Sequence, residues 1–470
     1  MEDSALRSEG PSYSFRPDNL RAITARFMTY CQEYSYHFKV TTRYVVDESR
    51  SYLSGLLMKA PRKNMERMEE YVESCDYEST QHFISESPWD YRAVINHVAD
   101  DINRIIGGAD SVLAIDESGF TKKGTKSAGV ARQYNGRLGK VDNCQVGVFG
   151  ALTNGRDVGL IDARLYLPKE WTSSSIRCEE AGIPEEHRVF KTKWELGLEI
   201  IDNAKNNNIQ FGTVGFDGFY GSVPAFIDGI VLRGLKFCGA VHKDQMLYIS
   251  DPEPYMPRRK EKIGRKFSKY KTREIAFRAD ELNETCDLPW ELITVREGTK
   301  GYVRVNARRK RVFLWDEGTT NVRELWFLMT KDCGTDEIKY FLSNFDSDAS
   351  LKELVWSAVC RFFIERSFQD AKTSLGLKDY QVRVWNGWHH HMAMVFMAAL
   401  FMLKERIENR KDVTLLSCQD IVELLNIYLP RGDLSEEEIF RQMEKRHKKR
   451  QKSIESEYKK QRELRFLTYV

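Results

Sequence analysis

The chain has 470 residues, of which 41% are hydrophobic and 12% aromatic. That share of apolar side chains excludes a disordered polymer and is enough for large cores. At about 100–200 residues per domain, the length predicts two to four domains. The 72 basic residues nearly balance the 69 acidic ones, and a net charge of +3 is too small to indicate nucleic acid as a partner. Only local clusters of cations can argue for one.

The nine cysteines are scattered, without a C-x-x-C pair or a Cys/His cluster at zinc spacing, and predict reduced, intracellular thiols. The N-terminal stretch MEDSALRSEG lacks the apolar core of a signal peptide. The most apolar run covers residues 392–403 and is shorter than the ~18–20 residues that span a bilayer. We therefore expect a cytoplasmic protein without a membrane segment.

Residues 1–106 predict a small α-helical domain. Its helix-like segments cover residues 20–33, 49–59, 64–73 and 88–106, and polar breaks separate them. Ser87 and Pro88 suit the cap and the first turn of the last segment. Helical domains of this size often bind DNA, but no clear helix-turn-helix signature is present, so packing or dimerisation is an equal alternative.

A β-rich stretch begins at residue 111. Ser111–Ile115 is a short apolar strand that ends at the acidic pair Asp116 and Glu117. The elements that follow are predicted as two strands, a helix capped by Thr192, a strand, a helix and a strand, at residues 145–152, 158–165, 192–206, 212–216, 222–232 and 235–241. The fourth strand ends at Asp217. This is the element order of the α/β ribonuclease H-like fold, in which carboxylates at the ends of the first and fourth strands meet.

The second half of the chain predicts an interruption of this core. Residues 243–345 are basic and strand-like, which indicates a β-rich insertion, and helices are expected at about 350–375, 388–408 and 434–465. The predicted division begins with an N-terminal helical domain at residues 1–106 and a first core part at 107–242. The insertion follows at 243–345. A second core part with the catalytic helix covers 346–410, and a basic helical C-terminal region covers 411–470.

Phosphodiester chemistry with two Mg²⁺ ions needs several carboxylates, because the hard ions lie about 3.5–4 Å apart and prefer oxygen ligands. Asp116 and Asp217 are two candidates, and Glu365 is the third. Glu365 shares a helix face with cations at i, i+4, i+8 and i+11 spacing, formed by Arg361, Glu365, Gln369 and Lys372. Glu117 and Asp370 are second-choice ligands. Each acid alone is more often a cap, a loop residue or half of a surface ion pair, and only their joint placement in one fold favours catalysis.

Several motifs around these acids resemble a known family. They are IDESGFTKKG at 115–124, SAGVARQY at 127–134, RFFIERSFQDAK at 361–372, GLKDYQVR at 376–383 and YLSGLL at 52–57. In these motifs the sequence resembles the insertion-sequence 701-like transposases, relatives of the insertion-sequence 4 group in the DDE, ribonuclease H-like superfamily. The resemblance covers about residues 20–410. It implies that Asp116, Asp217 and Glu365 are the catalytic, metal-binding triad.

Two details depart from the pattern of the wider group. In its Tyr-x2-Arg-x3-Glu-x6-Lys signature the tyrosine position holds Ala358, although Arg361, Glu365 and Lys372 match. The second block, Val214–Gly221, also differs from the expected Ala-Asp-Gly-Tyr-Gly. Family members carry a β-rich domain between the second aspartate and the glutamate, which agrees with the insertion inferred above.

Clusters of cations are the candidates for DNA contact. Residues 258–273 hold nine Lys or Arg against one acid, and residues 296–311 hold seven against one. The candidate DNA-binding residues of the whole chain are Lys122, Lys123, Lys126, Arg132, Arg258, Arg259, Lys260, Arg308, Arg309, Lys310, Arg361 and Lys372. A hairpin tip or a solvated loop is the alternative for each cluster. The helix at 434–465 is a DNA-binding arm, a subunit contact or a solvated helix.

Two aromatic groups have competing interpretations. Trp290, Trp315 and Trp326 could stack on a flipped base, but tryptophan is more often a core residue. His389, His390 and His391 cannot share one helix face, so packing or contact with the DNA backbone is favoured over zinc binding.

The sequence therefore predicts a cut-and-paste DNA transposase of a bacterial insertion sequence, located in the cytoplasm with the nucleoid. It would use two Mg²⁺ ions, with Mn²⁺ as a substitute, and act on double-stranded DNA at the terminal inverted repeats and the target. A homodimer is expected, because two transposon ends must be brought together. The alternatives are a ribonuclease H-like nuclease without strand transfer and a transposase-derived DNA-binding protein.

Overall fold

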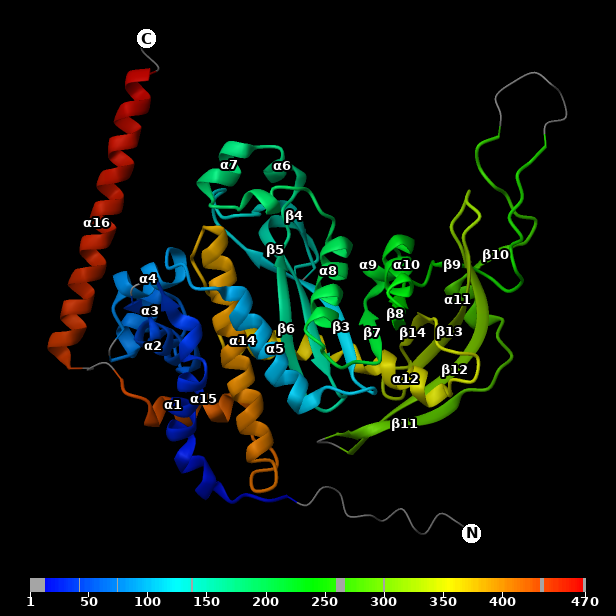
Figure 1. The fold of residues 1–470 in the computed structure, drawn as a ribbon, viewed down its shortest axis with the longest axis horizontal. Coiled ribbons are helices and arrows are strands. Elements are labelled where there is room, and N and C mark those ends of the chain that lie inside the picture. Colours follow the sequence, from blue (N-terminus) through cyan, green and yellow to red (C-terminus); the bar gives the residue numbers. More distant parts are fainter. Residues whose placement is uncertain are drawn as a thin grey trace.

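The computed structural model describes residues 13–41, 43–73, 75–136, 138–258, 267–298, 301–431 and 435–467. Its central feature is one mixed sheet, to which twelve strands of the described residues contribute (Figure 1). The sheet order is β10-β9-β12-β13-β14-β8-β7-β3-β5-β4, and β11 and β6 pair with β12 and β5.

The middle of this sheet has the predicted core topology. β3 (Val112–Thr121), β5 (Lys140–Thr153) and β6 (Val158–Leu165) form an antiparallel meander, and β4 (Ala131–Asn135) pairs with the start of β5. β7 (Thr213–Phe216) lies parallel to β3, and β8 (Lys236–Val241) lies parallel to β7. The strand order β6-β5-β3-β7-β8 is that of a ribonuclease H-like core, so the predicted fold class is confirmed.

Helices connect these strands as the pattern predicts. α8 (Lys193–Asn206) begins at Thr192, which forms a capping box with Glu195. After β7 come α9 (Gly218–Gly221) and α10 (Pro224–Leu232), and the β6–α8 connection holds α6 (Lys169–Thr172), α7 (Ser175–Glu180) and a 3-10 turn at Glu185–His187.

The predicted insertion is β-rich, but its strands continue the core sheet. Its elements are β9 (Met246–Tyr248), β10 (Ala276–Arg278), α11 (Ala279–Glu284), β11 (Glu291–Gly298), β12 (Gly301–Trp315), β13 (Val322–Asp332) and β14 (Ile338–Ser343). β14 pairs antiparallel with β8, from Tyr340 opposite Val241 to Ser343 opposite Cys238. This pairing covers the edge that β8 would otherwise leave open.

The helix predicted at 350–375 is two helices, α12 (Leu351–Cys360) and α13 (Phe363–Ser374), which are separated at Arg361 and Phe362. α14 (Trp385–Glu408) contains the apolar run and is buried almost all round. α15 (Cys418–Tyr428) and the charged α16 (Glu436–Leu467) follow. None of the described helices is long and apolar enough to cross a membrane.

The N-terminal segment is helical, as predicted. After a 3-10 turn at Pro17–Ala22, its helices are α1 (Ile23–Glu33), α2 (Val46–Leu57), α3 (Met65–Tyr71), α4 (Tyr77–Ser85) and α5 (Tyr91–Ile106), with a 3-10 turn at Ser35–Phe38 and a small hairpin of β1 (Lys39–Val40) and β2 (Arg43–Tyr44) between α1 and α2. The sequence did not predict α4. The cap of α5 is Asp90, whose side chain accepts hydrogen bonds from the backbone N–H groups of Arg92 and Ala93, and not Ser87.

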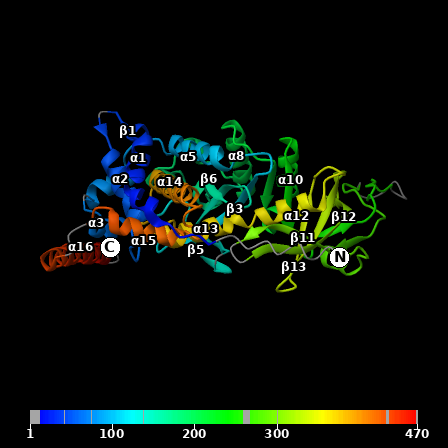
Figure 2. The ribbon, with the colours of Figure 1, turned by 90° about the horizontal axis from the view of Figure 1, so that it is seen from below.

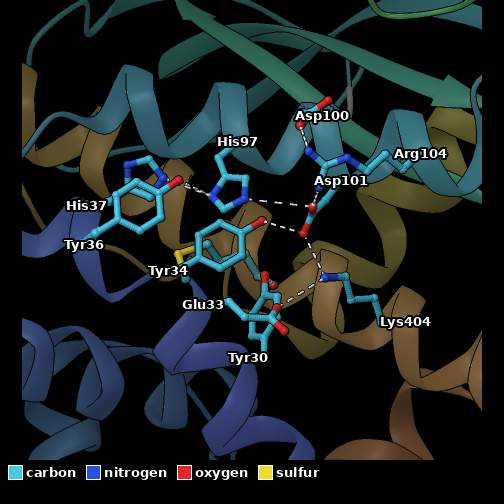
Figure 3. Close-up of polar contacts among 11 residues, drawn as sticks. Tyr30, Glu33, Tyr34, Tyr36, His37, His97, Asp100, Asp101, Arg104 and Lys404 are labelled. Atoms are coloured by element: carbon cyan, nitrogen blue, oxygen red, sulfur yellow. Dashed lines mark hydrogen bonds and ion pairs between the residues drawn. The ribbon is translucent and has the colours of Figure 1, made fainter.

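The N-terminal helices pack directly against the core, because their buried residues and those of the central strands form one hydrophobic cluster. A polar cluster ties α5 to its neighbours (Figure 3). Asp101 of α5 accepts a hydrogen bond from the Tyr34 hydroxyl at 3.1 Å and one from Lys404 Nζ of α14 at 2.8 Å. In the view from below, α1, α2, α3 and α16 lie at one end of the molecule and the inserted strands at the other, with α13 between them (Figure 2).

Candidate active site

Two of the predicted acids lie side by side on neighbouring parallel strands: Asp217 directly follows β7, whereas Asp116 lies inside β3, which runs on to Thr121 and does not end at Asp116 as predicted. The register pairs Ile115 of β3 with Phe216 of β7, so that Asp116 and Asp217 follow directly paired residues. Neighbouring strands lie about 4.8 Å apart. Asp217 also caps the short helix α9, since its Oδ1 accepts hydrogen bonds from the N–H groups of Phe219 at 3.1 Å and Tyr220 at 3.3 Å.

Arg361 links the third acid, Glu365, to Asp116. Its Nη1 lies 3.8 Å from Asp116 Oδ2, and its Nη2 donates a hydrogen bond to Glu365 Oε1 at 2.7 Å. Arg361 stands at the end of α12 and Glu365 in the first turn of α13. The predicted i, i+4 relationship therefore holds across the break between the two helices.

The negative charges of Asp217 and Glu365 act on the carboxyl group of Asp116. Burial raises the pKa of Asp116 to about 7, and the negative charge of Asp217 adds to this effect. The Arg361 guanidinium opposes the rise in the pKa of Asp116, and Glu365 contributes a smaller increase. Asp116 is thus a buried carboxyl group in a field of like charges, as is typical of catalytic sites.

The donor set suits a hard divalent cation, because it consists of carboxylate oxygens that repel one another and are partly withdrawn from water. Among the residues that the structure describes, no three Asp, Glu, His or Cys side chains are gathered closely enough to enclose a metal ion. The Arg361 guanidinium supplies the counter-charge between Asp116 and Glu365 instead.

The second-choice acids point elsewhere. Glu117 follows Asp116 in β3, and successive side chains of a strand face opposite sides of the sheet. Its Oε1 accepts a hydrogen bond from Lys193 Nζ of α8 at 2.7 Å. Asp370 faces α15, where its Oδ2 lies 3.9 Å from Cys418 Sγ.

Tyr220 is a site residue that the sequence did not reveal. It is fully buried, and its hydroxyl has no hydrogen-bond partner among the described residues. Burial raises its pKa well above the usual value, and the charges of Glu117, Asp116 and Asp217 add to the rise. The sequence signal was the second block, Val214–Gly221, which contains Tyr220 and whose expected form also has a tyrosine after its aspartate.

The lysines of the loop that follows β3 differ in their exposure to solvent. Lys123, Lys126 and Arg132 are exposed. Lys122 turns inward, where its Nζ donates to the Tyr380 carbonyl oxygen at 3.0 Å and lies 3.3 Å from the centre of the Tyr380 ring. Burial lowers the pKa of this lysine to about 7. Lys122 is thus a packing residue beneath the surface, which differs from the exposed DNA-gripping position expected for it.

The cations of the insertion also differ in their exposure to solvent. Arg308 is buried and donates to the carbonyl oxygens of Cys286 and Leu288. Arg309 stacks on Trp326 with its guanidinium 4.1 Å from the ring centre, and Lys310 is half-buried. Arg258 is exposed, whereas Arg259 and Lys260 lie outside the described residues.

The tryptophans and histidines have structural neighbours. The indole N–H groups of Trp315 and Trp326 donate to the carbonyl oxygens of Thr319 and Asp346, and Trp290 packs under the Arg308 guanidinium. The three consecutive histidines of α14 are buried, and the ring nitrogens of His390 face the carbonyl oxygens of Ile84 and Trp89. The predicted packing role of these histidines is confirmed.

The sequence of the site matches a known family. Residues 37–302, more than half of the chain, match the family model of the DDE superfamily endonucleases. The chain belongs to this family. The match to the DDE superfamily endonucleases includes Asp116 and Asp217 and ends before Glu365. The family generally uses divalent metal ions.

Relatives of this DDE endonuclease agree with the predicted resemblance. The chain is 24% identical over 369 residues to a probable transposase for insertion sequence element IS701 from Microchaete diplosiphon, covering 77% of this chain and 83% of that protein. Among solved structures it resembles a piggyBac transposase synaptic complex with hairpin DNA, at 13% identity and a TM-score of 0.39 over 87% of this chain and 77% of the other. The second likeness is too distant to carry an argument.

Proposed function

We propose that this DDE endonuclease is the transposase of a bacterial insertion sequence, which cleaves the ends of its element and joins them to target DNA by a cut-and-paste route. The observation that supports the proposal is that the charges of Asp217 and Glu365 act on the buried carboxyl group of Asp116, while Arg361 contacts both Asp116 and Glu365. The name of the 24% identical relative supports the same reading.

In this proposal Asp116, Asp217 and Glu365 hold two Mg²⁺ ions, for which Mn²⁺ can substitute. The bound ions supply a nucleophile at neutral pH and stabilise charge on the attacking and leaving oxygens. Asp217 is held in place as the cap of α9, and Glu365 is oriented by its hydrogen bond to Arg361. Both acids are thus fixed by short-range contacts before substrate binds.

Arg361 has a second role in this reading. Its guanidinium already lies between two carboxylates and presents a planar set of donors that matches phosphate oxygens. When DNA enters, Arg361 would exchange its contact with Asp116 for the phosphate group that is cut. Lys372, about two turns beyond Glu365 along α13, would add positive charge beside the same strand.

Duplex DNA is the proposed substrate, first as the terminal inverted repeats and then as the target. The exposed Lys123, Lys126, Arg132 and Arg258 remain the proposed backbone contacts. A homodimer is proposed for the complex that joins two ends, because both ends must be held during one reaction cycle.

The test is metal-dependent nicking of duplex DNA copied from the regions that flank the coding sequence. Asp116→Asn should lower nicking by several orders of magnitude while binding of the same duplex stays within about twofold. Asp370→Asn, which changes an acid of α13 that faces Cys418, is the matched control and should nick normally. Full nicking by the Asp116→Asn variant would refute the assignment.

A second assay separates transposition from simple cleavage. Pre-cleaved ends with a free 3′-hydroxyl are supplied with plasmid DNA and Mg²⁺. A transposase joins them to the plasmid, whereas a ribonuclease H-like nuclease without strand transfer leaves them unjoined.

A further inference from the structure

A cavity of 230 Å³ is lined in part by β3 and α13, the elements that carry Asp116 and Glu365, but none of the three acids lines it. Three parts of the chain meet around it: the loop before α3, the far half of β3, and α13 with the loop that follows it. The residues that line it are Arg62, Asn64, Gly119, Phe120, Thr121, Lys372, Lys378, Asp379 and Gln381.

The lining carries positive charge. Arg62, Lys372 and Lys378 stand against a single acid, Asp379. Arg62 and Lys378 are exposed and form no ion pair within the described residues. The cavity therefore presents two exposed cations, Arg62 and Lys378, that are outside the ion pairs of the described residues.

The carboxylate of Asp379 lies close to two partly or fully buried lysines, Lys63 and Lys122. Its Oδ2 accepts a hydrogen bond from the Lys63 backbone N–H at 3.0 Å, and its charge acts on the ammonium groups of Lys63 and Lys122. Lys63 Nζ is fixed by the carbonyl oxygens of Leu56 and Ser374, each at 2.6 Å. An anion in the cavity therefore faces Arg62, Lys372 and Lys378, while the Asp379 carboxylate is already engaged by the Lys63 backbone N–H.

The distance from the acids can be read along β3. Gly119 and Thr121 lie three and five residues beyond Asp116 in the same strand, which at about 3.3 Å per residue is roughly 10 and 17 Å. Duplex DNA advances about 3.4 Å per nucleotide along its axis. A DNA strand that runs along β3 from Asp116 would therefore bring a phosphate about three to five nucleotides from the cut to the cavity.

We propose that this cavity binds a backbone phosphate of the cleaved DNA, three to five nucleotides from the bond that is cut. The inference rests on the proposed function. Arg62 and Lys378 are the contacts that it adds, and Arg62 gives the N-terminal helical segment a direct part in placing the DNA end. Arginine suits this role because its planar donors match phosphate oxygens.

The test measures how the dissociation constant of a fluorescein-labelled duplex, copied from the DNA that flanks the coding region, depends on salt. A lost phosphate contact reduces the slope of log K against log salt by about one. We expect that reduction for the double variant Arg62→Gln/Lys378→Gln. Arg156→Gln is the matched control, because its turn joins β5 to β6 at the opposite end of β3, where Val112 pairs with Thr153. An unchanged slope in the double variant overturns the proposal.

A second arm locates the contact. Single methylphosphonate groups, which remove one phosphate charge, are placed along the duplex. Substitution three to five nucleotides from the cut should weaken binding of the wild-type protein about tenfold and leave the double variant unaffected. Equal weakening in both proteins overturns the proposal, as does competition by inorganic phosphate without any methylphosphonate effect, which indicates a site for the free anion.

The two levels of inference fail separately. If the wild-type protein does not nick these duplexes in Mg²⁺, the proposed function fails. If it nicks them and the salt slope of the double variant is unchanged, only the phosphate site fails. Circular dichroism of the double variant checks its fold, which two exposed side chains should not affect.

Discussion

At the residue scale, Arg361 is the side chain on which the site depends, because it contacts two of the three acids and stands at the junction of two helices. Helical spacing was sufficient to relate Arg361 to Glu365. It was not sufficient to show that Arg361 also reaches Asp116, since that contact depends on how α13 packs against β3. The sequence predicted the acids and Arg361, but not that Arg361 joins Asp116 to Glu365.

Metal binding should stabilise the wild-type fold. If Asp116, Asp217 and Glu365 hold Mg²⁺, an ion concentration about one hundred times its dissociation constant adds about 2.7 kcal/mol to the free energy of unfolding. Thermal unfolding in Mg²⁺ should therefore occur a few degrees higher than in EDTA. Asp116→Asn should lose most of this shift and Asp370→Asn should keep it. A full shift in Asp116→Asn contradicts the proposed ligand set.

The buried histidines predict a pH dependence of stability. Burial lowers the pKa of His391 from 6.5 to about 3, and its ring accepts or donates a hydrogen bond with the Tyr52 hydroxyl at 2.8 Å. Since the unfolded chain binds the proton first, the stabilising contribution is present above pH 6.5 and is lost as the pH falls towards the folded-state pKa. Between about pH 6.5 and 5 the loss for one such histidine is about 1.5 kcal/mol.

Chemical denaturation at these two pH values tests this. His391→Asn should show a drop in unfolding free energy that is smaller than the wild-type drop by about 1.5 kcal/mol. His447→Asn, on the exposed surface of α16, should match the wild type. Asp116, whose pKa is raised, changes stability in the opposite sense, but its contribution cancels when variants are compared. Equal drops in all three proteins contradict the prediction.

Lys122 shows why some residues could not be placed from sequence. Its neighbours in the chain are glycines and other lysines, which is typical of an exposed loop. Its partner Tyr380 is distant in sequence, and only the folded chain brings the ring over the ammonium group. Arg308 was misplaced for the same reason, because the carbonyl groups that bind it lie on a loop before β11.

At the element scale, the core strands and α8 were predictable because alternation, turns and the Thr192 cap are local signals. The break between α12 and α13 was not, since residues 360–363 contain no Pro or Gly and the apolar periodicity runs through them. The pairing of β14 with β8 was missed because strand order depends on contacts far apart in sequence. Composition correctly indicated strands in the insertion but not their place in the sheet.

Close packing between β7 and β8 predicts a sensitive glycine. Gly239 pairs with Phe216, and a Cβ atom at Gly239 would lie 1.8 Å from Cε2 of that ring. Gly239→Ala must displace Phe216, the residue before Asp217, and should lower the free energy of unfolding by about 1–3 kcal/mol. Urea denaturation measures this loss. Gly108→Ala, where nothing lies within 4 Å of the added Cβ, should change stability by less than about 0.5 kcal/mol.

At the scale of the whole molecule, the N-terminal helices share a hydrophobic core with the ribonuclease H-like strands. Tyr30 of α1 donates a hydrogen bond to the Met397 carbonyl of α14, and Phe27 packs edge-on against Phe401. The predicted boundary near residue 106 therefore marks a change of secondary structure within one packed body. Apolar periodicity predicts which face of a helix is buried but not which segment covers it.

The C-terminal helix should be dispensable for folding. Its described contacts with α3 are the ion pairs Lys445–Glu69 and Arg446–Glu70, in which both cations are partly exposed. The two glutamates are largely buried, but Glu70 keeps its ion pair with Arg67 of α3 when α16 is removed. A chain that ends before residue 435 should lose no more than about 1 kcal/mol of unfolding free energy.

A longer truncation supplies the control for this prediction. Ending the chain before residue 411 also removes Ile421 and Leu425 of α15, which are fully buried. Each such loss costs about 2–5 kcal/mol, so this chain should unfold at much lower urea concentration. A loss above about 3 kcal/mol on removal of α16 alone would show that the helix makes contacts beyond those ion pairs.

The hydrogen-bonded ladder between β14 and β8 has a mechanical consequence. β8 neighbours β7, β7 leads to Asp217, and β14 neighbours β13 of the insertion, which in turn pairs with β12. A load applied to the inserted strands therefore passes across the backbone ladder to the base of the acid cluster without crossing a flexible linker. Pulling or twisting a duplex bound on those strands would therefore act on the carboxylates through the paired backbone of the sheet.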